Sequence, residues 1–101
     1  MTKYYFFIVA FFLPSLVFAD SDIILKKLIN TSECIECDLS NLDLKKVNLF
    51  NANIMQSDFS KTNLTKSNLH GANLSKATFN QTILIGAQLQ SANLNNANFE
   101  K

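Results

Sequence analysis

An apolar residue returns at every fifth position over residues 37–101, without an insertion or a break. These central positions are Leu39, Leu44, Leu49, Ile54, Phe59, Leu64, Leu69, Leu74, Phe79, Leu84, Leu89, Leu94 and Phe99. A small or modest residue stands two positions before each of them, and Asn or Asp commonly lies between the two. A period of five fits neither a strand, which repeats every two residues, nor a helix, which repeats about every 3.6. The pattern therefore predicts a different repeating architecture.

The five-residue period is explained if each unit forms one side of a square coil, with two or three extended residues and a corner. The central residue and the small residue before it then point inwards, and the other positions face water. Successive coils would stack at strand spacing, about 4.8 Å, with their backbone groups paired between coils. Among the central residues Phe occurs only at Phe59, Phe79 and Phe99, which are twenty residues apart. Coils of four units would stack these rings in one column above Leu39.

The units at residues 72–76, 92–96 and 97–101 resemble the A(D/N)LXX pattern of the pentapeptide-repeat family, and thirteen consecutive units can be aligned to it. Residues 34–39 are also similar to the CxxCDL opening of many such domains. The resemblance implies an all-β solenoid, a right-handed quadrilateral β-helix of about three coils over residues 37–101. It implies no enzymatic activity, because members share a scaffold and mostly lack an assigned function.

The outward positions of the predicted coils are mainly polar. Stacked amides would form hydrogen-bonded ladders along two faces, in the rows Asn53, Asn73, Asn93 and Asn48, Asn68, Gln88. Gly71 and Gly86 both stand at the fifth place of a unit, where a turn residue is expected.

Residues 1–19 have the pattern of a secretory signal peptide. Lys3 precedes an almost wholly apolar run over residues 4–16, and Val17 and Ala19 stand at minus three and minus one before an acidic segment. The run is short for a transmembrane helix and contains Pro14. We therefore predict cleavage after Ala19 and export to the bacterial envelope, as a periplasmic or secreted protein. Contact with a membrane is expected only if the segment is retained as an anchor.

Residues 20–36 are predicted to form a short N-terminal capping helix and a turn. Ile24, Leu25, Leu28 and Ile29 share one face at helical spacing, and acidic residues near the start suit a helix N-terminus. An isolated helix of about ten residues is marginal in water. Its apolar face is therefore expected to dock on the first end of the repeat stack.

The charge of the chain bears on its partners. Residues 20–101 contain eight lysines, no arginine and eight acidic residues, so this part is near neutral. Without arginine and without basic residues interleaved with aromatics, nucleic-acid binding has little support. Some members of the family mimic DNA and bind DNA gyrase, a mechanism that needs a long, strongly acidic rod. The neutral charge, the short length and the signal peptide disfavour such a topoisomerase-binding function.

Cys34 and Cys37 form a C-x-x-C pair just before the repeats. A disulfide that staples the turn is the leading interpretation, because export leads to an oxidising compartment. A redox site would require a βαβ setting, and a zinc site would require four ligands, with His70 as the only other Cys or His. We predict a structural disulfide with no metal or cofactor; a CxxC thiol/disulfide or metal-binding envelope protein is the alternative.

The candidate interaction residues lie on the outside of the predicted coils. They are Phe50, Met55, Ile83 and Ile85, which are either isolated exposed side chains or contacts for a partner. His70 follows the inward Leu69 and is expected to be exposed and inert. Since side chains fill the interior, we predict a non-enzymatic scaffold or protein-interaction module with an unknown protein partner. The last coil exposes Phe99 and unpaired backbone edges, which favours a homodimer through that end.

Overall fold

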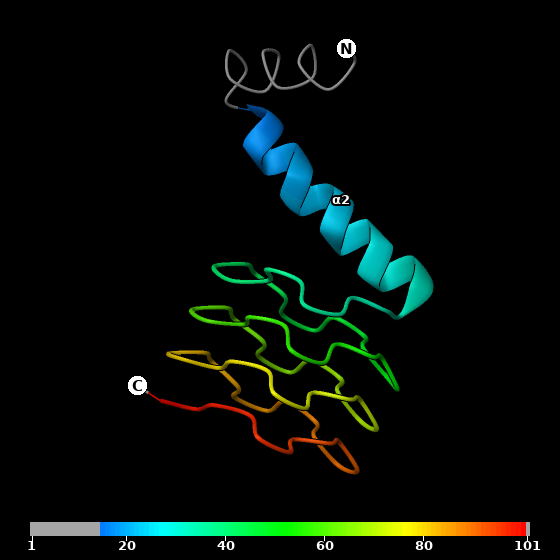
Figure 1. Ribbon diagram of the computed structural model, residues 1–101, viewed down its shortest axis with the longest axis vertical. Helices are drawn as coiled ribbons and strands as arrows, with labels where there is room; N and C mark the ends of the chain where they lie inside the picture. Colours follow the sequence, from blue (N-terminus) through cyan, green and yellow to red (C-terminus); the bar gives the residue numbers. More distant parts are fainter. Residues whose placement is uncertain (1–14, 101) are drawn as a thin grey trace.

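The computed structural model describes residues 15–100, and Figure 1 shows a helix standing on a short stack of coils. Helix α2 covers Ser15–Thr31. The chain then winds into a column in which each coil lies directly against the one before it (Figure 1). No helix within residues 15–100 combines the length and the apolar character needed to cross a bilayer.

The coils contain four units each, because every β-bridge joins residues that are twenty apart. The parallel bridges are Glu33↔Asn53, Asp38↔Asp58, Asp43↔Asn63, Asn48↔Asn68, Asn53↔Asn73, Asp58↔Thr78, Asn63↔Ile83, Asn68↔Gln88, Asn73↔Asn93 and Thr78↔Asn98. This spacing agrees with the prediction of four five-residue units per coil. The bridges are isolated, however, so each side pairs through a single bridge residue and not through a longer strand as expected. The reason is the turn that begins two residues after each bridge.

Three backbone hydrogen bonds per unit join neighbouring coils. In the unit of residues 37–41, the amides of Leu39 and Asn41 donate to the carbonyl oxygens of Asp58 and Ser60 at 2.8 and 2.9 Å. The Asp58 amide donates back to the Cys37 carbonyl at 2.9 Å. The same offsets recur along the stack, so the backbone groups of the inner coils are satisfied without a long strand.

The fifth residue of each unit turns the corner with a left-handed backbone. These residues are Glu36, Asn41, Lys46, Asn51, Gln56, Lys61, Lys66, Gly71, Lys76, Gln81, Gly86, Ser91 and Asn96. Most are not glycine, although their φ values lie near +60°. At Gly71 a Cβ would also meet Oδ1 of the exposed Asn51 side chain on the previous coil, so that side chain would have to turn away. At Gly86 the corresponding contact, with Lys66 Cγ, would be 3.2 Å.

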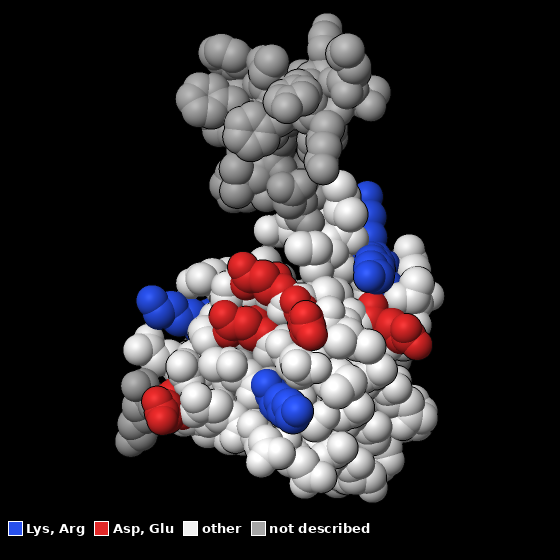
Figure 2. Space-filling view, in the orientation of Figure 1, with Lys and Arg blue, Asp and Glu red and all other residues white. Residues whose placement is uncertain are grey.

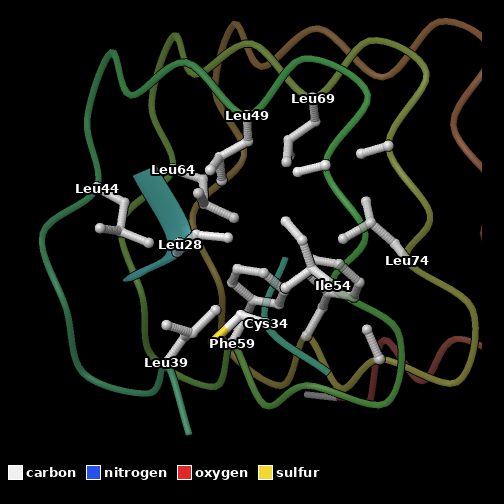
Figure 3. Close-up of a cluster of buried hydrophobic side chains, with 14 residues drawn as sticks. Leu28, Cys34, Leu39, Leu44, Leu49, Ile54, Phe59, Leu64, Leu69 and Leu74 are labelled. Atoms are coloured by element: carbon white, nitrogen blue, oxygen red, sulfur yellow. The ribbon is translucent and has the colours of Figure 1, made fainter. Parts of the chain in front are cut away.

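The core is the column of central residues with the small residues beside them. Central side chains from Leu39 to Phe79 are buried, and Figure 3 shows them converging inside the coil. Phe59 stacks on Phe79 with ring centroids 5.1 Å apart, and Phe79 stacks on Phe99 at 4.8 Å. These contacts confirm the predicted aromatic column. Burial decreases in the last coils: Leu84, Leu89 and Leu94 are partly buried, and Phe99 is 49% exposed.

Helix α2 caps the first coil with a narrower apolar face than predicted. Leu28 is fully buried in the core cluster, and Ile24 and Leu25 pack against it. The assignment of Ile29 to this face is wrong, since the side chain is 52% exposed. The helix ends where Ser32, with φ of +57°, donates its amide to the Leu28 carbonyl at 2.8 Å.

The boundaries of the first elements differ from those predicted. Helix α2 begins at Ser15, so it runs through the junction at which cleavage is predicted. Most of the predicted signal peptide, residues 1–14, lies outside the described residues, and its cleavage stays a prediction. The repeats begin at residue 32 and not at residue 37, because Glu33 bridges Asn53 and Cys34 takes the central, buried place of one further unit. Cys34 acts there as a small apolar residue.

Candidate functional site

The two cysteines are joined in a disulfide at the junction of α2 and the first coil. Cys34 and Cys37 have their Cα atoms 5.5 Å apart and form the predicted pair. Cys34 is fully buried in the same core cluster as Leu28 (Figure 3), whereas Cys37 is only partly buried. The bond therefore spans one corner of the solenoid, with one sulfur atom in the core and the other nearer its surface.

A serine from the second coil completes this corner. The Ser57 hydroxyl donates to the Cys34 carbonyl at 2.7 Å and accepts the Cys37 amide at 3.0 Å. Corners from Leu44–Val47 onward are closed by a direct bond from the amide of their fourth residue to the carbonyl of their first, as between Val47 and Leu44. The hydroxyl thus replaces the direct backbone bond at the disulfide.

The surroundings of the disulfide give no support to the metal-binding alternative. Over residues 15–100, no group of three or more His, Cys, Asp or Glu side chains is placed to hold a metal ion. His70 contacts an aromatic ring on the outer surface, and both cysteines are used in the disulfide. The donor set that a zinc site requires is not assembled in the described chain.

The predicted outward residues lie on the surface, in two separate places. Phe50 is 49% exposed and stacks on His70 with ring centroids 5.4 Å apart. His70 is half-buried and not fully exposed as expected, because the Phe50 ring covers one face of the imidazole. Met55 is partly buried on the second coil. Ile83 and Ile85 are 43% and 71% exposed on the third.

The rows of Asn and Asp have a second role that the ladder prediction did not include. Side-chain oxygens at this position accept the amide two residues later in nine units, as Asn73 does from Ser75 at 3.2 Å. Amide ladders form between Asn48 and Asn68 and between Asn53 and Asn73, both at 3.2 Å. The residues thus shape each corner as well as joining the coils, which explains why a short acceptor side chain recurs there.

Acidic side chains gather on the part of the solenoid nearest α2, whereas the surface farther from the helix is mostly uncharged in the view of Figure 2. Hydrogen bonds from the Ser40 hydroxyl and amide hold the pKa of the Asp38 carboxyl below its ordinary value. Lys45 and Asp43 form an ion pair at 3.5 Å, but both side chains are exposed. Such a pair contributes little to stability.

Sequence reasoning missed Ser57 as part of the cysteine corner. The sequence did contain an indication: Ser57 is a hydroxyl residue at the inward position two residues before a central residue, and a buried hydroxyl needs a hydrogen-bond partner. The same position carries Thr62 and Thr82, whose hydroxyls donate to the carbonyls of Leu39 and Phe59. Which carbonyl lies opposite depends on the stacking of the coils and could not be read from local sequence.

Comparisons with known proteins agree with this geometry. A family model described as pentapeptide repeats, in eight copies, matches residues 32–71 and 63–100. No curated protein matches the chain. The family match supports the right-handed quadrilateral β-helix that the repeat predicts. The match begins at residue 32, which is also the first residue of the additional unit found in the structure.

Solved structures similar to the chain include two cyanobacterial proteins. The pentapeptide repeat protein Rfr23 from Cyanothece 51142 has 17% identity and a TM-score of 0.45, with 79% of this chain and 95% of that one covered. HetL from Nostoc sp. strain PCC 7120, a pentapeptide repeat protein involved in heterocyst differentiation regulation, has 22% identity and a TM-score of 0.44. That alignment covers 64% of this chain and 39% of HetL. On the strength of the family match over its coils, this chain belongs to the pentapeptide-repeat family.

Proposed function

We propose that this chain is a non-catalytic protein-interaction module that is exported to the bacterial envelope and binds a protein partner through its outer faces. The observation that carries the proposal is the contrast between the two sides of the coil. Central side chains such as Leu64 fill the interior, whereas Phe50 and Ile85 stand outward with 49% and 71% of their surface exposed. Exposure of large apolar side chains to water is unfavourable in free energy, and binding of a partner over them would bury this surface.

Two features support export. The sequence of residues 1–19 has the pattern of a cleaved signal peptide. The Cys34–Cys37 disulfide suits an oxidising compartment such as the periplasm or the extracellular space. Amino-terminal sequencing of protein isolated from periplasmic and membrane fractions tests this part. A mature chain starting at Asp20 is expected, and an intact amino terminus in the membrane fraction would show that the segment is retained as an anchor.

The outer faces are tested by photo-crosslinking in cells. A photoreactive phenylalanine analogue is introduced at Phe50 or Ile85, and in matched controls at the exposed, polar corner positions Gln56 and Lys61. We expect a crosslinked protein adduct from at least one of the apolar positions and none from the controls. Equal yields from both groups, or no adduct from either apolar position, would contradict the proposal.

A homodimer through the last coil is part of the same proposal. Phe99 covers Phe79 on one side but is 49% exposed on the other, and the neighbouring Leu94 is only partly buried. Sedimentation of the 101-residue chain should show a dimer that Phe99→Asp converts to a monomer. A wild-type protein that stays monomeric at high concentration, or a variant that stays dimeric, would exclude this interface.

A further inference from the structure

The disulfide lies where helix α2 is joined to the solenoid. Helix α2 ends at Thr31, and only Ser32 and Glu33 separate it from Cys34. Cys34 is fully buried in the same cluster as Leu28, the one residue in this helix's described part that is fully buried (Figure 3). The disulfide is therefore connected to the docked end of the helix by a two-residue segment and by this shared buried cluster.

The corner held by the disulfide has weaker backbone closure than the corners from Leu44–Val47 onward. Its amide and carbonyl meet only through the Ser57 hydroxyl, whereas those corners close by a direct bond of 3.0–3.4 Å. The corner between Leu39 and Leu42 also lacks a direct bond, and the Thr62 hydroxyl donates to the Leu39 carbonyl there. The covalent bond between Cys34 and Cys37 is thus the only direct closure across this turn that the structure records. The disulfide therefore adds a covalent closure to a corner that is otherwise held by the next coil, through Ser57 and through the bonds of the Cys34 and Glu36 amides to the carbonyls of Asn53 and Met55.

Helix docking also rests on few contacts. Leu28 is fully buried, and Ile24 and Leu25 are partly buried against the core. Ile23 and Ile29 are 62% and 52% exposed, so they contribute little burial. Over residues 21–31, whose burial the structure describes, the buried face is narrow, and a short helix segment of this kind depends on its attachment to the coil.

We propose that the Cys34–Cys37 disulfide is a redox-sensitive latch that holds α2 on the first coil and releases it when a dithiol reduces the bond. The reagent's thiolate attacks the Cys37 sulfur, which lies nearer the surface, and Cys34 leaves as a thiolate that takes up a proton. The second thiol of the reagent then attacks its own sulfur in the mixed disulfide and releases Cys37. The protein gains two electrons and two protons, and the dithiol becomes a cyclic disulfide.

Reduction loosens the corner for a steric reason. Two thiol sulfurs cannot remain at bonding distance and must separate to van der Waals contact. Cys37 is only partly buried and can move towards solvent, but Cys34 is fully buried, so any part of the separation that falls on its sulfur displaces neighbours in the core. Leu28 is the helix residue that belongs to the same buried cluster, and the coil is held by hydrogen bonds to the next coil. The helix is therefore the element that yields.

Hydrogen–deuterium exchange of the full chain, with and without dithiothreitol, tests the latch. Reduction is expected to accelerate exchange of the amides of residues 24–36 about tenfold or more, while residues 57–79 keep their protection within about twofold. Unchanged protection of residues 24–36 would overturn the proposal. A uniform loss of protection over the whole solenoid would also overturn it, because the latch acts on the helix alone.

Two further measurements test whether the effect of dithiothreitol comes from the Cys34–Cys37 bond and in which order its sulfurs react. Cys34→Ala/Cys37→Ala is the matched control, and its exchange should not respond to dithiothreitol; a response would show that the reagent acts elsewhere. In the wild-type protein, brief alkylation during reduction should label Cys37 before Cys34. Faster labelling at Cys34 would contradict the order of attack.

Discussion

Replacing Ser57 by alanine should destabilise the solenoid, whereas the same change at Ser67 should not. Both serines occupy the inward small position and are buried, at 1% and 0% exposure. They differ in their hydrogen bonds. Ser57 donates to the Cys34 carbonyl at 2.7 Å and accepts the Cys37 amide at 3.0 Å, but the Ser67 hydroxyl has no partner among the described residues.

The difference in stability between the two variants follows from the backbone groups that each substitution leaves without a hydrogen-bond partner. Ser57→Ala leaves a carbonyl and an amide without a partner, and each unsatisfied buried group costs about 1–3 kcal/mol. Because the Cys37 amide is only part-buried, we expect a total loss of about 2–3 kcal/mol. Ser67→Ala removes a hydroxyl that is already unsatisfied, so its effect should lie between zero and a gain of about 1 kcal/mol.

Urea unfolding followed by circular dichroism measures both variants against the wild type. The midpoint should fall for Ser57→Ala and stay or rise for Ser67→Ala, with slopes that remain equal. Equal losses at the two sites would refute the reasoning, since they would show that the buried volume and not the hydrogen bonding sets the cost. A loss confined to Ser67→Ala would contradict it as well.

Three other changes test the packing, the corners and the electrostatics. Phe59→Ala should lower the free energy of unfolding, measured by urea titration, by about 3–5 kcal/mol, because it opens a cavity at a fully buried ring. Phe99→Ala should lower it by less than half as much, since this ring is 49% exposed. Equal losses for the two variants would contradict this difference in burial. Gly71→Ala should raise the free energy of the folded state by about 1 kcal/mol, because φ is +72° and the new methyl group displaces the Asn51 side chain. An unchanged midpoint would be inconsistent with a cost for the left-handed backbone at this corner. The hydrogen bonds from Ser40 lower the pKa of Asp38, so their stabilisation is present above the ordinary carboxyl pKa and is lost as the pH falls through the lowered one. In an NMR titration Ser40→Ala should therefore raise the pKa of Asp38, and an unchanged value would reject the assigned cause.

The repeating part of the fold could be predicted from the sequence because each unit carries its own information. A central apolar residue every fifth position determines which side chains face inwards, and the spacing of Phe59, Phe79 and Phe99 indicates the number of units per coil. The bridges and ring contacts agree with both inferences. Local periodicity was sufficient here since neighbouring coils repeat the same contacts.

The ends of the repeat were harder to predict. The sequence pattern places Cys34 in the turn before the first unit, whereas in the structure it takes the central core position of one further unit. The helix was expected from its apolar spacing, but Ile29 lies outside the face that contacts the coil. The direction in which a helix docks depends on the surface beneath it, and the helix sequence alone does not contain that information.

The cysteine corner was predicted only in part. The pairing of Cys34 with Cys37 followed from their spacing and the expected compartment, and the structure forms this bond. The hydroxyl of Ser57 comes from the next coil, so its role depends on which residues the coil brings together. The left-handed backbone of lysines and other non-glycine residues at the corners was also not apparent. Inter-coil hydrogen bonds on both sides fix these residues in a conformation that they would seldom adopt alone.

The square coil with a filled interior is the central claim, and nuclear Overhauser contacts test it most directly. The structure predicts contacts between the ring protons of Phe59 and Phe79, and between backbone protons of bridged residues such as Asp58 and Thr78. Each contact joins residues twenty positions apart. Long-range contacts at another regular spacing, or none between these pairs in the folded protein, would contradict the fold and with it the conclusion that the outer faces carry the function.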